Sequence, residues 1–252
     1  MRRLAVAVLV TASLVLSLGA CSDDNDLSGG DSTLTVFAAS SLTESFGSLK
    51  KAFEDQHPDA DVVLSFGSST TLAEQIVADA PADLIATANK TSVSIVQKAD
   101  MLAAQPTEFA TNTLVIVTPP DNPAHITRLS DLSSADFIMC DPSAPCGAAS
   151  KEMLANAGIT AQPKSLGADV KAVLNKVKLG EADAGLVYVT DATAAGDKVQ
   201  SVDIPAKVNV VNPYYIAAVA DSPHAELAQE WLELVASKTG RTALHKAGFG
   251  TT

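Results

Sequence analysis

Basic residues are scarce in this 252-residue sequence, which has 17 Lys and Arg against 29 Asp and Glu and a formal net charge of −12. A nucleic-acid-binding protein needs a basic footprint, and an anionic membrane surface attracts clusters of Lys and Arg. The composition therefore excludes both partners, and at first sight it also argues against an anionic ligand. Aromatic residues are few at 4%, but 47% of the residues are hydrophobic, as in a folded globular chain.

Cysteine and histidine are too few and too scattered to form a recognisable metal site. The chain has three cysteines and four histidines, without the paired spacing that zinc sites require. We therefore expect no cofactor and no metal held directly by side chains. Cys140 and Cys146 are close in sequence, and in an exported chain, where disulfides persist, their spacing permits a disulfide that closes a small loop.

The N-terminal segment indicates export. Arg2 and Arg3 precede an apolar run over residues 4–18, and small residues then lead to Cys21. A transmembrane helix needs about 20 apolar residues, whereas a basic start, a short apolar run and small residues before the cleavage site are typical of a signal peptide. We assign this role to residues 1–20. The cysteine resembles that of a bacterial lipobox, which implies lipidation of Cys21 and anchoring to the outer face of the cytoplasmic membrane.

Strand-like and helix-like segments alternate after a short tether. Residues 21–33 are small, polar and acidic, and they predict a lipidated flexible linker. The alternation that follows favours an α/β fold with mostly parallel sheets flanked by helices. The number of strands favours two lobes. We assign residues 34–112 to lobe 1, residues 113–211 to lobe 2, and residues 212–252 to a return to lobe 1.

The elements are predicted from hydrophobic periodicity. The expected strands cover residues 34–38, 62–66, 83–88, 114–117, 137–140, 184–189 and 214–219, and the expected helices begin near residues 42, 72, 93, 148, 170 and 227.

Hydroxyl and small residues gather where these strands end and helices begin. Ser40 and Ser41 follow the first strand, and the run 68–71 (Ser-Ser-Thr-Thr) follows the second. Ser41-x-x-Glu44 and Thr71-x-x-Glu74 match the capping-box pattern, which is the structural interpretation. The functional interpretation is a ligand site, because open α/β sheets bind ligands at the carboxyl ends of their strands.

Two further helix starts repeat this pattern at residues 145–148 and 167–170. Each helix start has unpaired N–H groups and a partial positive charge. Four such ends around a cleft would bind an anion without any Lys or Arg, so the acidity of the chain does not exclude an anionic ligand. A site made only of donors also favours a fully ionised oxyanion over a protonated one.

The chain resembles the periplasmic molybdate-binding proteins of ABC importers, which have a type II periplasmic-binding-protein fold with the ligand cleft between two lobes. The resemblance spans roughly residues 34–250 and rests on these segments: 37–43 (FAASSLT), 65–76 (SFGSSTTLAEQI), 80–84 (APADL), 169–170 (DV), 185–192 (GLVYVTDA) and 248–250 (GFG).

The resemblance implies that neutral hydrogen-bond donors hold the oxyanion. The implied ligands are Ser41 and Ser69 through hydroxyl and N–H, Cys146 and Val170 through backbone N–H, and Tyr188 through its hydroxyl. Relatives often have Ala at the position of Ser40, which leaves open whether Ser40 or Ser41 is the ligand. By contrast, we expect Asp83 and Asp191 to brace the backbone and Lys171 to lie on a solvated face.

The implied function is capture of molybdate, and of tungstate, for the membrane permease of an ABC importer, without catalysis. One alternative is a receptor for another oxyanion, such as sulfate or thiosulfate. A serine hydrolase that uses a Ser-rich cluster is a weaker alternative, because the sequence lacks the Gly-x-Ser-x-Gly motif.

Overall fold

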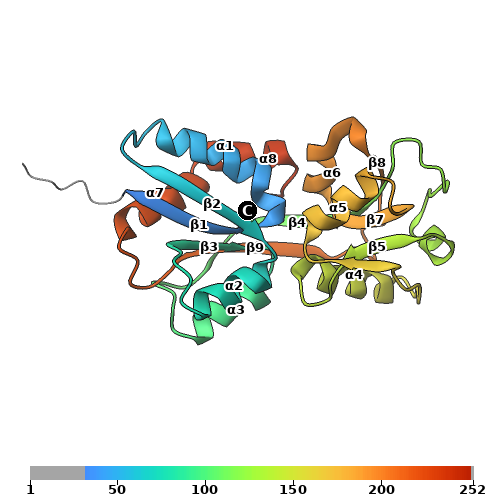
Figure 1. The fold of residues 1–252 in the computed structure, drawn as a ribbon, viewed down its shortest axis with the longest axis horizontal. Helices are drawn as coiled ribbons and strands as arrows, with labels where there is room; N and C mark the ends of the chain where they lie inside the picture. Colours follow the sequence, from blue (N-terminus) through green and yellow to red (C-terminus); the bar gives the residue numbers. More distant parts are fainter. Residues whose placement is uncertain (1–31, 251–252) are drawn as a thin grey trace, which may run out of the picture. The chain divides into compact units, whose positions relative to one another are not determined.

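The computed structural model describes residues 32–250, which form a mixed α/β fold (Figure 1). The expected signal peptide, the lipidation site Cys21 and the tether up to residue 31 lie outside the described residues. Within the described range, no helix has both the length and the apolar character that a membrane span requires.

The first part of the chain builds parallel strands with helices on both sides. Its elements are β1 (Thr33–Ala39), the 3-10 turn η1 (Ser40–Leu42), α1 (Thr43–Glu54), β2 (Asp61–Gly67), α2 (Ser69–Val77), β3 (Leu84–Thr87) and α3 (Lys90–Lys98). β1 pairs in parallel with both β2 and β3. In Figure 1, α1 lies on one side of these strands and α2 and α3 lie on the other.

The middle of the chain repeats this arrangement around a second group of strands. Its elements are η2 (Leu129–Ser134), β5 (Phe137–Cys140), α4 (Pro145–Asn156), β6 (Ser165–Gly167), α5 (Val170–Lys178), β7 (Ala184–Tyr188), α6 (Val189–Ala195), η3 (Gly196–Lys198) and β8 (Gln200–Val202). β5 pairs in parallel with β6 and with β7. Figure 1 places α4 on one side of these strands and α5 and α6 on the other.

Two antiparallel strands, β4 (Thr107–Thr118) and β9 (Val211–Ala218), connect the two groups. β4 pairs with β9 through residues 107–113 and with β7 and β8 through residues 114–118. The strand order is therefore continuous, β2-β1-β3-β9-β4-β7-β5-β6, with β8 paired to β4 outside this path. The chain ends with α7 (Ala225–Ala236) and α8 (Lys238–Ala247).

The core beside the first strands is built by the apolar face of α1. Leu42, Phe46, Leu49 and Phe53 recur at helical spacing and all are buried. The rings of Phe46 and Phe53 pack edge-on against Trp231 of α7, with centroid distances of 5.7 Å and 5.5 Å. This packing fixes the start of α1 at the carboxyl end of β1, where the serine cluster lies.

Candidate functional site

The site residues predicted from the sequence line one small cavity. Its wall is formed by residues from five strand-to-helix junctions and from the end of β7: Ala39, Ser40, Ser41, Gly67, Ser68, Ser69, Ala88, Ala144, Pro145, Cys146, Asp169, Val170 and Tyr188. The cavity has a volume of about 10 Å³, whereas pockets for organic ligands of drug size measure about 300–1,000 Å³. The guest that fits this site is therefore a single compact ion or molecule.

Strand register explains why distant segments meet at this cavity. In the parallel pair β1 and β2, Ala39 lies opposite Gly67, so the two serine clusters begin side by side. In the parallel pair β5 and β6, Cys140 lies opposite Gly167, so the starts of α4 and α5 are also neighbours. Parallel strands thus direct all four helix starts to the same edge of their sheets.

The capping-box interpretation of the hydroxyls is wrong. The residue before α1 is Leu42 rather than Ser41, and its side chain makes no capping hydrogen bond. Thr71 lies inside α2, and Ser68, which precedes that helix, makes no side-chain cap either. The serine hydroxyls at these two helix starts are therefore not consumed by capping.

The hydroxyl oxygens of Ser41 and Ser69 are instead paired within the protein. Ser69 Oγ accepts a hydrogen bond of 3.0 Å from the backbone N–H of Ala88. Ser41 Oγ lies 2.7 Å from the hydroxyl of Tyr214. Because a serine hydroxyl has one proton and two lone pairs, the proton of Ser69 is free to point into the cavity while its oxygen is held by Ala88.

The hydroxyl of Tyr188 is buried and has no hydrogen-bond partner among the described residues. Its side chain lines the cavity and is 1% exposed. Burial, reinforced by the neighbouring Tyr214 and Asp191, raises the pKa of this phenol well above its ordinary value, so it stays protonated. Buried polar groups in folded proteins are nearly always paired, and an acceptor in the cavity would satisfy this donor.

Backbone N–H groups enter the wall at the starts of α4 and α5. Cys146 is the second residue of α4 and Val170 is the first residue of α5, and N–H groups in a first helical turn have no partner within the helix. Cys146 also forms a disulfide with Cys140, with the two Cα atoms 5.7 Å apart. At Gly147, an added Cβ would lie 1.9 Å from the carbonyl oxygen of Asp141, so only glycine permits this tight junction.

Charged groups are nearly absent from the wall as the structure describes it. Asp169 is the one lining residue with a charged side chain, and its carboxylate accepts the N–H of Ala172 at 2.9 Å as the cap of α5. Asp83 also braces the backbone, as expected, because it accepts the N–H of Thr35 at 2.6 Å. The cavity is therefore lined mainly by neutral donors.

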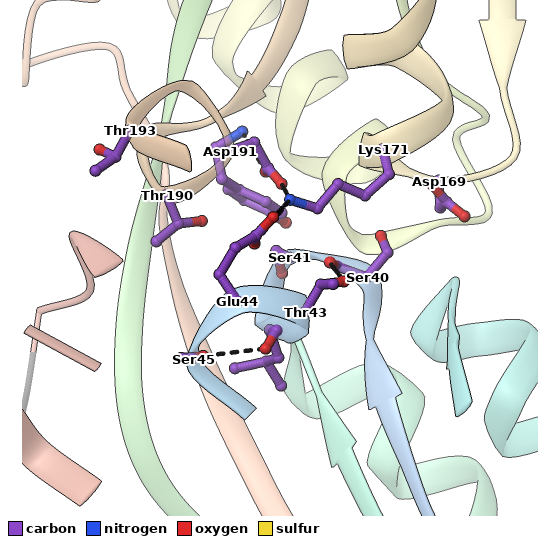
Figure 2. Close-up of polar contacts among 12 residues, drawn as sticks. Ser40, Ser41, Thr43, Glu44, Ser45, Asp169, Lys171, Thr190, Asp191 and Thr193 are labelled. Carbon is purple, nitrogen blue, oxygen red and sulfur yellow. Dashed lines mark hydrogen bonds and ion pairs between the residues drawn. The ribbon is translucent and has the colours of Figure 1, made fainter. Parts of the chain in front are cut away.

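The expectation that Lys171 lies on a solvated face is wrong. Its side chain is 21% exposed, and its ammonium lies 2.8 Å from the carboxylate of Glu44 and 3.2 Å from that of Asp191. Figure 2 shows the lysine reaching between the two carboxylates. Glu44 lies on α1 whereas Lys171 and Asp191 lie on α5 and α6, so the lysine joins the two groups of elements beside the cavity.

Burial shifts the titration of this ionic group. Burial raises the pKa of the Asp191 carboxyl to about 6, although Lys171 opposes the shift. Burial alone would lower the pKa of the Lys171 ammonium, but the charges of Asp191 and Glu44 raise it above its ordinary value. Asp191 also accepts the backbone N–H of Tyr188 at 3.3 Å. The ionic group therefore supports the backbone that positions the unpaired phenol.

A larger hollow of about 640 Å³ lies between α1, α6 and α8. Three of its hydroxyl groups already donate within the protein, because Ser45, Ser48 and Thr193 bond the carbonyl groups of Leu42, Glu44 and Val189, respectively. None of the site residues predicted from the sequence lines this hollow. Over residues 32–250 the structure also contains no group of three or more His, Cys, Asp or Glu side chains arranged to hold a metal ion.

Sequence reasoning missed Tyr214, Asn112 and the cross-contact of Glu44. Tyr214 was identified only as part of a strand. Its pairing with Ser41 depends on β9 lying beside β3 and β4, with 173 residues between the two hydroxyls. One signal in the sequence could have indicated these buried contacts: Asn112 and Asn212 both occur within otherwise strand-like segments. Buried amides in strands are uncommon and usually form specific hydrogen bonds.

The fold and the small cavity at the strand ends are those of a two-lobed solute-binding protein of the periplasmic type. Residues 34–250 match the family model of bacterial extracellular solute-binding proteins, and the chain belongs to this family. The chain is 39% identical to the molybdate-binding protein ModA of Mycobacterium tuberculosis over 96% of its length and 95% of the relative. It is 32% identical to YvgL of Bacillus subtilis, a putative ABC transporter substrate-binding lipoprotein, with 86% of each chain covered.

Solved structures of low sequence identity share the fold. The periplasmic molybdate-binding protein of Azotobacter vinelandii superposes with a TM-score of 0.78 at 19% identity, covering 87% of this chain and 99% of the other. The sulfate-binding protein SubI of Mycobacterium tuberculosis superposes with a TM-score of 0.77 at 18% identity, covering 86% of each chain. The relatives of this chain are solute-binding proteins rather than enzymes.

Proposed function

We propose that this chain captures molybdate, and also tungstate, and delivers the ion to the membrane permease of an ABC importer. Ser41, Ser69 and Tyr188 supply hydroxyl donors, Cys146 and Val170 supply backbone N–H donors, and Ser40 is the alternative or additional serine ligand at the same junction as Ser41. The metal is held as its oxyanion, so the protein needs no cofactor and performs no catalysis.

The unpaired hydroxyl of Tyr188 is the observation that carries this proposal. It is a protonated, fully buried donor in the wall of a cavity that also receives two helix starts. Leaving such a donor unpaired costs about 1–3 kcal/mol, whereas a hydrogen bond to a charged group contributes about 1.5–3 kcal/mol. A tetrahedral oxyanion accepts from several donors at once, so it offsets the loss of its own hydration.

The identity of the ion is supported by sequence rather than by shape. The mycobacterial relative with 39% identity is described as a molybdate-binding protein. Sulfate receptors share the fold, as the superposition with SubI illustrates. Sulfate and molybdate are both dianions, but the bonds of molybdate are longer and need a wider cage. Sulfate or thiosulfate therefore remains the alternative ligand.

The anchoring is part of the same proposal. Cleavage before Cys21 and lipidation of its thiol would hold the protein at the outer face of the bacterial cytoplasmic membrane, with residues 21–33 as the tether. The lipobox-like pattern supports this arrangement, and so does the lipoprotein description of the Bacillus relative. We also propose residues 34–112 and 212–252 as one lobe and residues 113–211 as the other, closing on the ion as hinged binding proteins do.

Isothermal titration of the purified chain with molybdate, tungstate, sulfate and thiosulfate tests the proposal. We expect molybdate and tungstate to bind with similar affinity and the two sulfur oxyanions to bind much more weakly. Absence of binding, or equal binding of all four anions, contradicts the proposal. Tight binding of sulfate alone would instead support the alternative receptor.

A further inference from the structure

Tyr214 touches the serine ligand without lining the cavity. It lies in β9, its side chain is fully buried, and its hydroxyl lies 2.7 Å from Ser41 Oγ. Of these two residues, only Ser41 belongs to the described wall of the cavity. The tyrosine hydroxyl can therefore act on a bound ion only through lining residues beside it, and Ser41 is the one to which it is hydrogen-bonded.

The neighbours of Tyr214 determine which way its proton points. The amide nitrogen of Asn112 lies 3.4 Å from the tyrosine hydroxyl and 2.9 Å from Thr190 Oγ1. An amide nitrogen only donates, so Asn112 occupies a lone pair of Tyr214 and leaves the phenol proton for Ser41.

We propose that Tyr214 is a positioning and specificity-determining residue, which donates its proton to Ser41 Oγ and so turns the Ser41 proton toward the ion. This inference rests on the proposed oxyanion-binding function. In this chain of hydrogen bonds, Asn112 donates to Tyr214, Tyr214 donates to Ser41, and Ser41 donates to the ion. Chains of hydrogen bonds with the same direction strengthen one another.

The second serine provides an internal comparison. Ser69 Oγ is held by the backbone N–H of Ala88, and a backbone N–H can only donate. The carbonyl of Ala88 in turn accepts from the amide of Asn212 at 3.2 Å. The direction of the hydrogen bond at Ser69 Oγ is thus fixed by the backbone. The direction of the hydrogen bond at Ser41 Oγ depends on the hydroxyl of Tyr214, which a substitution can remove. A single substitution at Tyr214 can therefore reverse the role of Ser41.

The consequence for selectivity concerns protonated oxyanions. At neutral pH inorganic phosphate carries at least one proton, and that proton needs an acceptor in the site. While Tyr214 donates to Ser41 Oγ, one lone pair of this oxygen is occupied and the Ser41 proton points toward the ion, so this serine meets the ion as a donor. Without the tyrosine hydroxyl, Ser41 Oγ is free to accept. The substitution should thus weaken binding of a fully ionised anion and relax the exclusion of a protonated one.

Tyr214→Phe tests this inference by titration of the full exported chain with molybdate and with inorganic phosphate at pH 7. We expect the affinity for molybdate to fall about tenfold, which corresponds to the loss of one hydrogen bond to a charged group. We expect the ratio of molybdate affinity to phosphate affinity to fall by a larger factor than the molybdate affinity alone, because the exclusion of phosphate is relaxed at the same time. Tyr215→Phe is the matched control, because its hydroxyl bonds Glu108 at 3.2 Å away from the cavity, and it should change neither value.

A second variant separates positioning from packing. Phenylalanine keeps the ring contacts of Tyr214 with Phe109, Tyr188 and Phe249, and thermal unfolding without ligand checks that the fold is kept. In a Ser41→Ala background, Tyr214→Phe should have almost no further effect on molybdate affinity. Full additivity in this double-mutant cycle would show that Tyr214 does not act through Ser41.

Three results overturn the inference: unchanged affinity for both anions, equal losses for both, or a gain in molybdate affinity. A gain would mean that Ser41 donates to Tyr214 in the native protein. If wild-type protein binds no molybdate at all, the proposed function fails together with the inference. If wild-type protein binds molybdate but Tyr214→Phe behaves like Tyr215→Phe, the inference alone fails.

Discussion

The ammonium of Lys171 lies 2.8 Å from both carboxylate oxygens of Glu44, although 127 residues separate the two in the chain. Lys171 directly follows Val170, a proposed ligand, and Glu44 lies three positions after Ser41. On the other side of the cavity, Thr70 donates to the carbonyl of Ser143 at 2.8 Å. Each of these contacts joins segments that lie next to proposed ligands, so we expect closure around the ion and ligand contact to be coupled.

Substitution of Glu44 should accelerate ligand release. Glu44→Gln removes the charge that meets Lys171 but leaves the lysine paired with Asp191. Because the Glu44 side chain is 47% exposed, we expect a release rate only about two- to fivefold faster, in line with exposed ion pairs. Stopped-flow displacement of molybdate by excess tungstate measures this rate. Glu74→Gln, an exposed position on α2, is the control, and equal rates in the two variants would contradict the coupling.

Asp191 should give the protein an unusual dependence of stability on pH. Burial raises the pKa of its carboxyl from 3.8 to about 6 in the folded state. The folded protein therefore holds this proton more tightly than the unfolded chain, so the stabilisation from Asp191 is complete below pH 4 and is lost as the pH rises through 6. The loss should amount to at most about 3 kcal/mol.

Urea unfolding at pH 5 and pH 7.5 tests this dependence. Asp191→Asn should remove most of the difference between the two pH values, whereas the exposed Asp203→Asn should keep it. Since the asparagine variant also loses its pairing with Lys171, the comparison uses the change with pH and not the absolute stability. An identical pH profile in wild-type protein and Asp191→Asn would show that this carboxyl does not titrate near pH 6.

Removal of the unpaired phenol should separate affinity from stability. Tyr188→Phe deletes a buried hydroxyl that has no partner in the described residues, so the unliganded protein should unfold at the same temperature or slightly higher. Molybdate affinity should fall about tenfold or more, because a hydrogen bond to a charged group is lost. Differential scanning calorimetry with and without molybdate measures both effects. A clear loss of stability without ligand would indicate a structural role instead.

The Cys140–Cys146 disulfide should contribute modestly to stability and directly to the site. Its sequence separation of 6 closes a short loop, for which the entropy model gives about 2 kcal/mol. The variant with both Cys140→Ser and Cys146→Ser should lose about this much, as measured by urea unfolding under oxidising conditions. Its molybdate affinity should also fall, because the loop positions the N–H of Cys146. Treatment of wild-type protein with a reductant should reproduce both changes, and the double variant should not respond to it.

The elements with a clear apolar period could be predicted from the sequence. The stripe of Leu42, Phe46, Leu49 and Phe53 predicted α1, and α5 and α7 were also found near their observed positions. The junctions where strands pass into helices were found for the same reason. The six ligands predicted from the sequence therefore all line one cavity. That they bind an oxyanion stays a prediction.

Elements without an apolar stripe could not be found in this way. α6 consists of small and polar residues (VTDATAA), and α8 is mostly polar, with Gly240 and Leu244 as its buried residues. The antiparallel pairing of β4 with β9 joins segments about a hundred residues apart, and no local pattern encodes it. Lys171 was misjudged because a helical lysine normally faces solvent, and its two partners, Glu44 on α1 and Asp191 on α6, are brought to it only by the fold.

The neutral wall of the cavity has a consequence for how the protein responds to ionic strength. Dissolved salt screens charge pairs over roughly 10 Å at 0.1 M, but it has little effect on short hydrogen bonds to neutral donors. The net charge of −12 repels an approaching dianion from a distance, and salt weakens that repulsion. The rate of oxyanion association should therefore be no lower at high salt than in dilute buffer, in contrast to receptors that attract anions with exposed lysines.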